Sequence, residues 1–446
     1  MTLYRAGRLP QYQGPAAWDA ILPPRPVEQS LEQDVSVDFA IIGGGFAGMA
    51  AARRLTELAP SARIAVVEAG HVAQGASGRN SGFMIDLPHD LASENYAGDG
   101  DDQTLTRLNR HAIAFSRDAV EDYQIDRNFF DPAGKINGAA TPAADTNNAS
   151  YADHLKSLSE TFERLDAQQM REITGSSHYS SGLYTPGTVM LQPAGYIRGM
   201  ADGLQRAGVA IFARSPAQSF VRDGSGWKIT TPKGKLRASK IILTVNGHLE
   251  SFGIAKGRLM QLFLFATMTP ELDPSALTRL GGEPRWGITP SDPMGTTLRR
   301  ISTGQGGNRI VTRTCAALRS NATAKSRDLH RAAKVMQRKF DARFPQLAGM
   351  AMEHTWSGHL CLSRNGVAVA REVDDGVFAG CVQNGLGTVR GTLTGIAAAE
   401  RAFGVESDIT RFFAGEEEPQ RLPPELIRDA SANAILRWKE WNARAE

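Results

Sequence analysis

The chain is poor in cysteine, and its cysteines are not paired. Its 446 residues include only Cys315, Cys361 and Cys381, which lie far apart. No C-x-x-C pair and no metal-binding spacing occurs. This argues against a dithiol redox centre, an iron–sulfur cluster or a cysteine-based metal site. We expect all three cysteines to be buried small apolar side chains in a reducing cytoplasm.

Excess charge and long apolar runs are also lacking. Lys and Arg total 50 against 47 Asp and Glu, with no long basic run, so no nucleic-acid partner is expected. The apolar stretch 260–268 has the length of a strand, so no membrane span is predicted. The segment MTLYRAGRLPQYQG lacks an apolar signal core, which favours a cytoplasmic location. A chain of this length favours two domains.

A glycine-rich turn stands between an apolar strand and a helix. The strand is residues 39–42, and the helical pattern runs to about Leu58. A second apolar strand, 63–67, ends at Glu68, twenty residues past the last glycine of the turn. The turn has the pattern G-x-G-x-x-G, formed by Gly43, Gly45 and Gly48. This is the dinucleotide-binding motif in its strand–helix–strand context; the alternative is an ordinary Gly-Gly-Gly loop.

Each residue of this motif has a physical task. Gly43 permits the tight turn, Gly45 lets the backbone approach a pyrophosphate, and Gly48 lets the helix pack on the strand. The helix start offers free N–H groups and a positive dipole end to phosphates. Glu68 can accept hydrogen bonds from a ribose diol. The expected contacts are Gly43, Gly45, Phe46, Ala47, Gly48, Glu68 and Ala69.

A second polar, glycine-rich loop follows the ribose acid. It offers backbone N–H groups, a hydroxyl, an amide and a guanidinium within a few residues, enough to satisfy a cofactor larger than NAD. A plain surface turn is the alternative. Its residues are Gly75, Ala76, Ser77, Gly78, Arg79, Asn80 and Ser81.

These motifs carry a family resemblance. The dinucleotide motif followed by GASGRN resembles the D-amino-acid oxidase superfamily of FAD-dependent amine oxidoreductases. The chain is most similar to the branch of γ-glutamylputrescine oxidase and L-pipecolate oxidase. That branch has a W-[TS]-G element, here Trp356-Ser357-Gly358, and a later glycine-rich turn, here Gln383 to Thr388. The likeness runs from about Asp34 to Gly404.

The resemblance implies an α/β (α+β) fold of two interleaved domains. A Rossmann-type FAD-binding domain of the glutathione-reductase/D-amino-acid-oxidase type would comprise residues 35–103, 190–255 and 350–414. An antiparallel-sheet substrate domain would comprise 104–189 and 256–349. Residues 1–34 would form an arm packed on the surface, and 415–446 a helical tail. Within these limits we expect helices over 104–123 and 151–173, and loop or edge structure over 132–150.

The resemblance also implies FAD, bound without a covalent link. Relatives that tether FAD do so through a cysteine near the W-S-G element, where this chain has Gly358. In the family, the later glycine turn faces the flavin pyrimidine ring, where N–H groups and a helix dipole stabilise the charge of the reduced flavin. A packing turn is the alternative. The further cofactor contacts implied are Ala217, Asn246, Gly247, Gly358, Gly385, Leu386, Gly387 and Thr388.

The chain departs from its relatives at this turn. Many of them have His or Arg where Leu386 stands, so reactivity with oxygen is in doubt. Arg390 could replace that charge or bind a substrate carboxylate. The resemblance implies oxidation of the C–N bond of an amine or amino acid by hydride transfer to flavin N5, giving an imine that hydrolyses. O2 is the expected acceptor; a dehydrogenase using a quinone or protein acceptor, and a non-catalytic flavoprotein subunit, are the alternatives.

No protein base or metal is required, because the flavin carries the difficult chemistry. The candidate substrate-site residues are Arg300, Trp356, His359 and Arg390. Arg299 and Arg300 must face opposite sides of a strand, so one could bind a substrate carboxylate while the other is solvated; two exposed arginines are equally plausible. Arg258 and Arg313 are weaker candidates. The other scattered histidines considered, His89, His111, His248 and His354, are expected to be structural.

Overall fold

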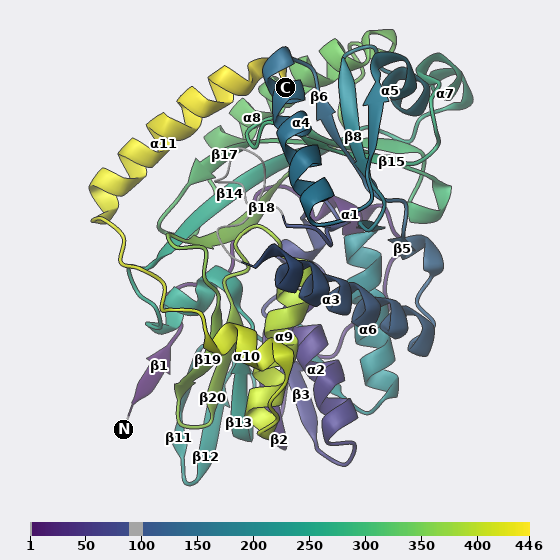
Figure 1. The fold of residues 1–446 in the computed structure, drawn as a ribbon. Helices are drawn as coiled ribbons and strands as arrows, with labels where there is room; N and C mark the ends of the chain where they lie inside the picture. Colours follow the sequence, from purple (N-terminus) through teal and green to yellow (C-terminus); the bar gives the residue numbers. More distant parts are fainter. Residues whose placement is uncertain (1, 89–100) are drawn as a thin grey trace.

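In a computed structural model the chain folds around two large β-sheets (Figure 1). The structure describes residues 2–88 and 101–446, apart from the side chains of Leu426 and Ile427, so His89 lies outside it. The predicted fold class is confirmed. No helix in the described ranges is long and apolar enough to cross a membrane.

The first sheet has a parallel core that suits the dinucleotide motif. Its parallel strands, in spatial order, are β10 (Ala210–Phe212), β3 (Ile64–Val67), β2 (Val35–Ile42), β13 (Lys235–Leu243) and β20 (Val377–Cys381). These strands are largely apolar because both faces of the sheet are covered. Antiparallel partners extend the sheet: β1 (Leu3–Arg5), β11 (Ser219–Asp223), β12 (Gly226–Thr230) and β19 (Val369–Asp374).

Helices pack against this sheet and one another. They are α2 (Phe46–Leu58), α3 (Asp102–Asp122), α6 (Pro193–Arg206) and α9 (Val389–Phe403). A Cβ on Gly395 of α9 would lie 2.1 Å from the Ala47 carbonyl oxygen, so glycine allows α2 and α9 to approach closely. Because α3 packs on α6 and α9, it belongs with the cofactor sheet. The predicted boundary at 104 therefore places this helix in the wrong unit.

The second sheet forms the other half of the molecule. Its order is β18 (His354–Ser363), β14 (Leu259–Met268), β17 (Arg309–Leu318), β16 (Thr297–Ile301), β15 (Trp286–Pro290), β6 (Lys135–Ala139), β8 (Ser181–Thr185) and β7 (Glu163–Asp166). All neighbours are antiparallel except β15 and β6. Strand β18 pairs with β14 over its whole length. The W-S-G element therefore lies in this sheet, not in the cofactor unit where we predicted it.

Residues 132–174 differ from the prediction. The expected loop contains β6 and the start of α4 (Pro142–Ser157), which Thr141 caps and Pro142 begins. The expected helix over 151–173 is interrupted by β7. A new helix, α5 (Ala167–Thr174), then starts at a capping box between Asp166 and Gln169. The apolar spacing alone did not reveal these two helix starts.

Among the described residues, the remaining strands form a small sheet, and there are five further α-helices. A small sheet joins β4 (Phe83–Met84), β9 (Val189–Leu191) and β5 (Phe130–Asp131). The other helices are α1 (Ala17–Ala20), α7 (Pro274–Leu280), α8 (Ser326–Arg343), α10 (Asp408–Ala414) and α11 (Glu425–Asn442). We had predicted an N-terminal arm on the surface, but part of it is buried. Trp18 is fully buried, and its indole N–H donates a 2.8 Å hydrogen bond to the Asn80 carbonyl oxygen.

Helix α11 lies along the outside of the second sheet (Figure 1). Strand β16 pairs with β17 only as far as Arg313. Beyond that point side chains of α11 bind the β17 backbone. Glu440 accepts from the Ala316 N–H at 2.9 Å, while Asn433 accepts from the Leu318 N–H at 3.1 Å and donates to its carbonyl at 3.0 Å.

Candidate active site

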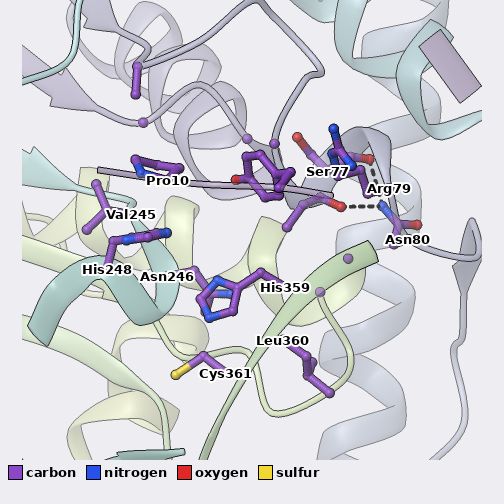
Figure 2. Close-up of a pocket in the computed structure, with 18 of the residues that line it drawn as sticks. Pro10, Ser77, Arg79, Asn80, Val245, Asn246, His248, His359, Leu360 and Cys361 are labelled. Atoms are coloured by element: carbon purple, nitrogen blue, oxygen red, sulfur yellow. Dashed lines mark hydrogen bonds between the residues drawn. The ribbon is translucent and has the colours of Figure 1, made fainter. Parts of the chain in front are cut away.

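One cavity lies where the two sheets meet, and both contribute to its wall (Figure 2). Its volume is about 250 Å³. Predicted cofactor residues that line it are Gly43, Gly45, Phe46, Ala47, Glu68, Ala69, Gly75, Ala76, Ser77, Arg79, Asn80, Ser81, Ala217, Asn246, Gly358, Gly385 and Gly387. Predicted cofactor residues outside this lining are Gly48, Gly78, Gly247, Leu386 and Thr388.

The first glycine turn brings the backbone to the cavity. Gly43 has φ +107°, and a Cβ there would lie 2.7 Å from the Thr244 carbonyl oxygen. A Cβ on Gly48 would lie 1.9 Å from the Gly43 oxygen, so Gly48 permits close packing rather than ligand contact. Gly45 precedes α2 and provides no side-chain cap, so the N–H groups of the first turn are available to an anion.

Glu68 directly follows β3, and its side chain binds the backbone of two neighbouring turns. Its carboxylate accepts hydrogen bonds from the Gly44 N–H at 2.8 Å and the Gly70 N–H at 2.9 Å. Burial raises the pKa of Glu68, while these N–H groups oppose the shift. Backbone hydrogen bonds therefore fix the carboxylate in place at the cavity wall.

The loop 75–80 is folded by its own polar groups. The Asn80 side-chain amide donates to the Ser77 carbonyl oxygen at 2.6 Å (Figure 2). The Gly82 N–H donates to Asn80 Oδ1 at 2.7 Å. A Cβ on Gly78 would lie 1.8 Å from the Ala73 oxygen, which makes this glycine a packing requirement. The loop thus keeps Ser77 and Asn80 at the cavity wall.

Arg79 joins three segments of the chain. Its guanidinium donates to the carbonyl oxygens of Gln74 at 2.7 Å, Gly14 at 3.1 Å and Ser357 at 3.1 Å. It also lies 4.4 Å from the centre of the Tyr12 ring. Burial lowers the pKa of Arg79 to about 10. The cation is thus largely engaged with backbone carbonyls.

The second glycine turn has an open side toward the cavity. Gly385 has φ +91°, whereas Gly387 does not adopt the left-handed region. Within residues 2–88 and 101–446, a Cβ on Gly387 would meet no heavy atom within 4 Å, and α9 begins without a side-chain cap. Leu386 instead packs with Phe83 and Ile85, and Thr388 donates a 2.7 Å hydrogen bond to the Phe83 oxygen.

These features fit FAD. Two helix N-termini without side-chain caps, α2 and α9, stand at the cavity, and a carboxylate suited to a ribose lies by the first. Gly45 and Gly387 leave free the space that a ring or a pyrophosphate needs. Bound FAD supplies a hydride acceptor, and the residues above would hold it. In the described ranges no group of three or more His, Cys, Asp or Glu is placed to hold a metal.

The predicted arginines are not where we expected them. Arg299 and Arg300 face opposite sides of β16, but both are buried. Arg300 donates to the carbonyls of Gly281 and Gly282, outside the cavity. Arg299 donates to the Leu191 and Ser81 oxygens, and burial lowers its pKa to about 9. Backbone carbonyls thus accept from Nη1 of each arginine, while the buried Nε of each has no hydrogen-bond partner among the described residues.

Arg390 and Arg258 also lie outside the cavity lining. Arg390 forms an ion pair with Glu416, so it does not supply the charge that Leu386 lacks. Arg258 donates to the Pro419 oxygen. Arg313, which we had ranked below Arg300, does line the cavity. It lies opposite Ala266 across β14 and β17, and Ala266 lines the cavity as well.

Trp356 and His359 both reach the cavity wall. The Trp356 indole donates a 3.0 Å hydrogen bond to the Arg79 oxygen. His359 Nε2 lies 2.8 Å from the Gln261 side-chain oxygen, and its ring centre is 5.2 Å from that of His248. Burial lowers the pKa of His359 to about 3 and that of His248 to about 4, so both rings are neutral near pH 7.

Sequence reasoning missed the arm. Arg8, Leu9, Pro10 and Tyr12 line the cavity although they precede the dinucleotide motif. No spacing rule links them to it. The only sequence signal was an aromatic residue, Tyr12, within a polar, proline-rich stretch.

Comparisons with known proteins agree with this geometry. The model of the family "DAO: FAD dependent oxidoreductase" matches residues 38–401. A probable oxidoreductase, OrdL, of Rhizobium meliloti (strain 1021) is 23% identical over 408 residues, which are 88% of this chain and 89% of that protein. Gamma-glutamylputrescine oxidoreductase of Escherichia coli (strain K12) is 24% identical over 223 residues, 49% of this chain and 51% of that protein.

A solved structure has the same fold. Glycine oxidase from Geobacillus kaustophilus superposes with a TM-score of 0.68 at 17% identity, covering 83% of this chain and 96% of that one. The dinucleotide motif, the cavity between two sheets and the extent of the family match agree with one another. The chain therefore belongs to the DAO family of FAD-dependent oxidoreductases.

Proposed function

We propose that this enzyme oxidises the C–N bond of an amine or amino acid that carries a carboxylate. When bound, FAD would accept the hydride from the carbon next to nitrogen while the nitrogen lone pair forms the C=N bond; the resulting iminium would lose a proton to solvent, and water would hydrolyse the imine. The protein's part is to orient the substrate, exclude water and hold the carboxylate.

The position of Arg313 is the observation that supports this proposal. The residue belongs to β17 of the substrate sheet and lines the same cavity as the dinucleotide motif. Around it the sheet contributes apolar wall from Leu264, Ala266 and Trp356. A guanidinium beside such a wall suits an anionic ligand, because it can form a bidentate, charge-assisted pair with a carboxylate.

The related proteins support the substrate class. The relatives are named for a gamma-glutamylputrescine and for glycine as substrates, both of which contain a carboxylate and a nitrogen bound to carbon. For this chain we propose the same chemical class: a γ-glutamyl-amine, a cyclic imino acid or an N-alkyl amino acid.

Anaerobic reduction of the bound flavin tests the proposal. The holoenzyme is mixed without oxygen with a panel of amino acids, cyclic imino acids and γ-glutamyl-amines, each paired with a neutral amine of the same skeleton. We expect the yellow absorbance to bleach with one acid-bearing class and far more slowly with its neutral partner. Equal bleaching by the neutral partners would rule out the carboxylate requirement.

O2 is the acceptor that we propose, with a dehydrogenase as the second candidate. One observation favours the dehydrogenase. Leu386 occupies the second glycine turn, and Arg390 is paired with Glu416 instead of facing the cavity. The measurement is hydrogen peroxide formed per substrate oxidised in air. A yield near one supports the oxidase, and slow turnover in air that a quinone accelerates supports the dehydrogenase.

We further propose that FAD is bound without a covalent link. Gly358 offers no side chain for attachment. The thiol of Cys361 lines the cavity, but burial raises its pKa well above the usual value, so it stays protonated and unreactive. Hot trichloroacetic acid should release all flavin into the supernatant; yellow colour in the protein pellet would show a covalent bond.

A further inference from the structure

The N-terminal arm crosses the cavity between two fixed ends. At one end β1 pairs with β11, the Tyr4 ring stacks on Phe220 with centres 4.6 Å apart, and the Tyr4 hydroxyl donates to Asp374 at 2.8 Å. At the other end the buried Trp18 is bonded to the Asn80 oxygen. Between these ends, residues of the arm form part of the cavity wall: Ala6, Arg8, Leu9, Pro10 and Tyr12.

Hydrogen bonds hold this middle part on two sides. On one side two hydrogen bonds join Gln13 to Ser357. The Gln13 N–H donates to Ser357 Oγ at 3.0 Å, and the Ser357 N–H donates to the Gln13 carbonyl oxygen at 2.9 Å. On the other side Arg8 donates to the Ser320 oxygen at 2.9 Å. The arm is thus attached both to the W-S-G strand β18 and to the turn after β17.

Tyr12 lies among the cofactor motifs. Its ring packs on the Arg79 guanidinium at 4.4 Å, and its hydroxyl is 3.2 Å from the position that a Cβ on Gly75 would take. Burial and the nearby Glu68 carboxylate raise the pKa of Tyr12, so the hydroxyl stays protonated. A neutral hydroxyl between Glu68 and the loop 75–80 is able to donate a hydrogen bond to a cofactor oxygen.

We propose that residues 8–14 form a strap over the FAD site, that Tyr12 is one of the residues that contact FAD, and that FAD leaves only when this strap lifts. Figure 2 shows Pro10 above Val245 and His248, at the opposite end of the view from Ser77 and Arg79. The strap thus extends along the cavity rather than covering one end. The inference concerns the cofactor, so it does not depend on which amine is oxidised.

The dissociation rate of FAD tests the strap. The variants Tyr12→Ala and Tyr12→Phe are compared with Tyr184→Ala, a control on β8 whose residue lies outside the cavity lining. Each holoenzyme is diluted, and release of FAD is followed by flavin fluorescence. We expect release at least tenfold faster for Tyr12→Ala, an intermediate rate for Tyr12→Phe, which keeps the ring, and the wild-type rate for Tyr184→Ala.

Proteolysis of the wild-type chain gives a second readout that needs no variant. Trypsin can cut after the exposed Arg8 in the strap and after the exposed Lys439 in α11. With FAD bound, cleavage after Arg8 should slow at least tenfold relative to the apoprotein, and cleavage after Lys439 should not change. Equal cleavage after Arg8 in both forms, or wild-type release of FAD from Tyr12→Ala, would overturn the proposal.

Discussion

Trp356 and the backbone of Arg79 are joined by a 3.0 Å hydrogen bond across 277 positions of the chain. The indole, only 1% exposed, belongs to the substrate sheet, and the carbonyl belongs to the cofactor loop. This bond fixes the distance between the two halves of the cavity. The W-S-G element is therefore a structural connection as well as a wall.

Trp356→Phe should destabilise the protein. A smaller aromatic ring replaces the indole, and the Arg79 carbonyl loses its buried donor, which costs about 1–3 kcal/mol of unfolding free energy. Thermal unfolding should shift to lower temperature, and FAD affinity should fall with it. Trp438→Phe, at a residue that is 61% exposed, is the matched control and should change neither quantity.

Glu68→Ala should weaken FAD binding while leaving the fold intact. The loss of hydrogen bonds to a charged group corresponds to roughly 1–3 kcal/mol of binding free energy. Titration of the apoprotein with FAD measures it, with Glu57→Ala at the far end of α2 as the control. Wild-type affinity in the Glu68 variant would mean that the ribose site is elsewhere.

Arg313→Met should raise the KM for the acid-bearing substrate. The loss of one charge-assisted pair, about 1.5–3 kcal/mol, predicts roughly a 10- to 150-fold increase. The matched controls are Arg300→Met and Arg390→Met, whose residues bind Gly281 and Glu416 outside the cavity lining. If one control raised KM as much as Arg313→Met, the assignment of the carboxylate site would be wrong.

Gly387→Val should impair reduction of the flavin more than its binding. No heavy atom of the described residues lies within 4 Å of a Cβ at this position, so the added side chain would occupy the space left for the ring. FAD can still be held by Glu68 and the first glycine turn. We expect slower reduction and a much weaker sulfite adduct, because the adduct needs the same charge stabilisation. Equal sulfite affinity in both proteins would show that the turn serves packing alone.

His359 and His248 should make the apoprotein sensitive to acid. Burial lowers both pKa values, to about 3 and about 4, so the unfolded chain takes up protons that the folded chain does not. Stability should therefore fall as pH drops from about 6.5 toward 4, by up to about 2 kcal/mol per histidine between pH 7 and pH 5. His359→Gln should flatten this fall in unfolding temperature; an unchanged slope would show that the ring titrates normally.

Much of the cofactor half was predictable because its signals are local. A strand, three glycines and an acid at fixed spacing specify one turn and one helix start, and the structure has them at Gly43–Gly48 and Glu68. The alternation of Arg299 and Arg300 was equally certain from strand geometry. The hydrogen-bond partners of the two arginines could not be predicted, because the carbonyls of Gly281 and Leu191 come from distant segments.

Two of the missed features, Arg313 and Tyr12, depend on contacts remote in sequence. Arg313 reaches the cavity because β14 and β17 pair Ala266 with it, a register that one strand cannot reveal alone. Tyr12 meets Arg79 only after the loop 75–80 has folded. Helix α4 was missed for a different reason, since its Thr141–Pro142 start is local and went unrecognised beneath a loop-like composition.

The side chains of Asn433 and Glu440 occupy positions on β17 that a further strand would use. An open strand edge offers a template on which another copy of the chain can add by backbone pairing. Helix α11 therefore blocks one route to aggregation, using two polar side chains in place of a whole strand. Loss of this helix would be expected to harm solubility during folding more than it harms the distant flavin chemistry.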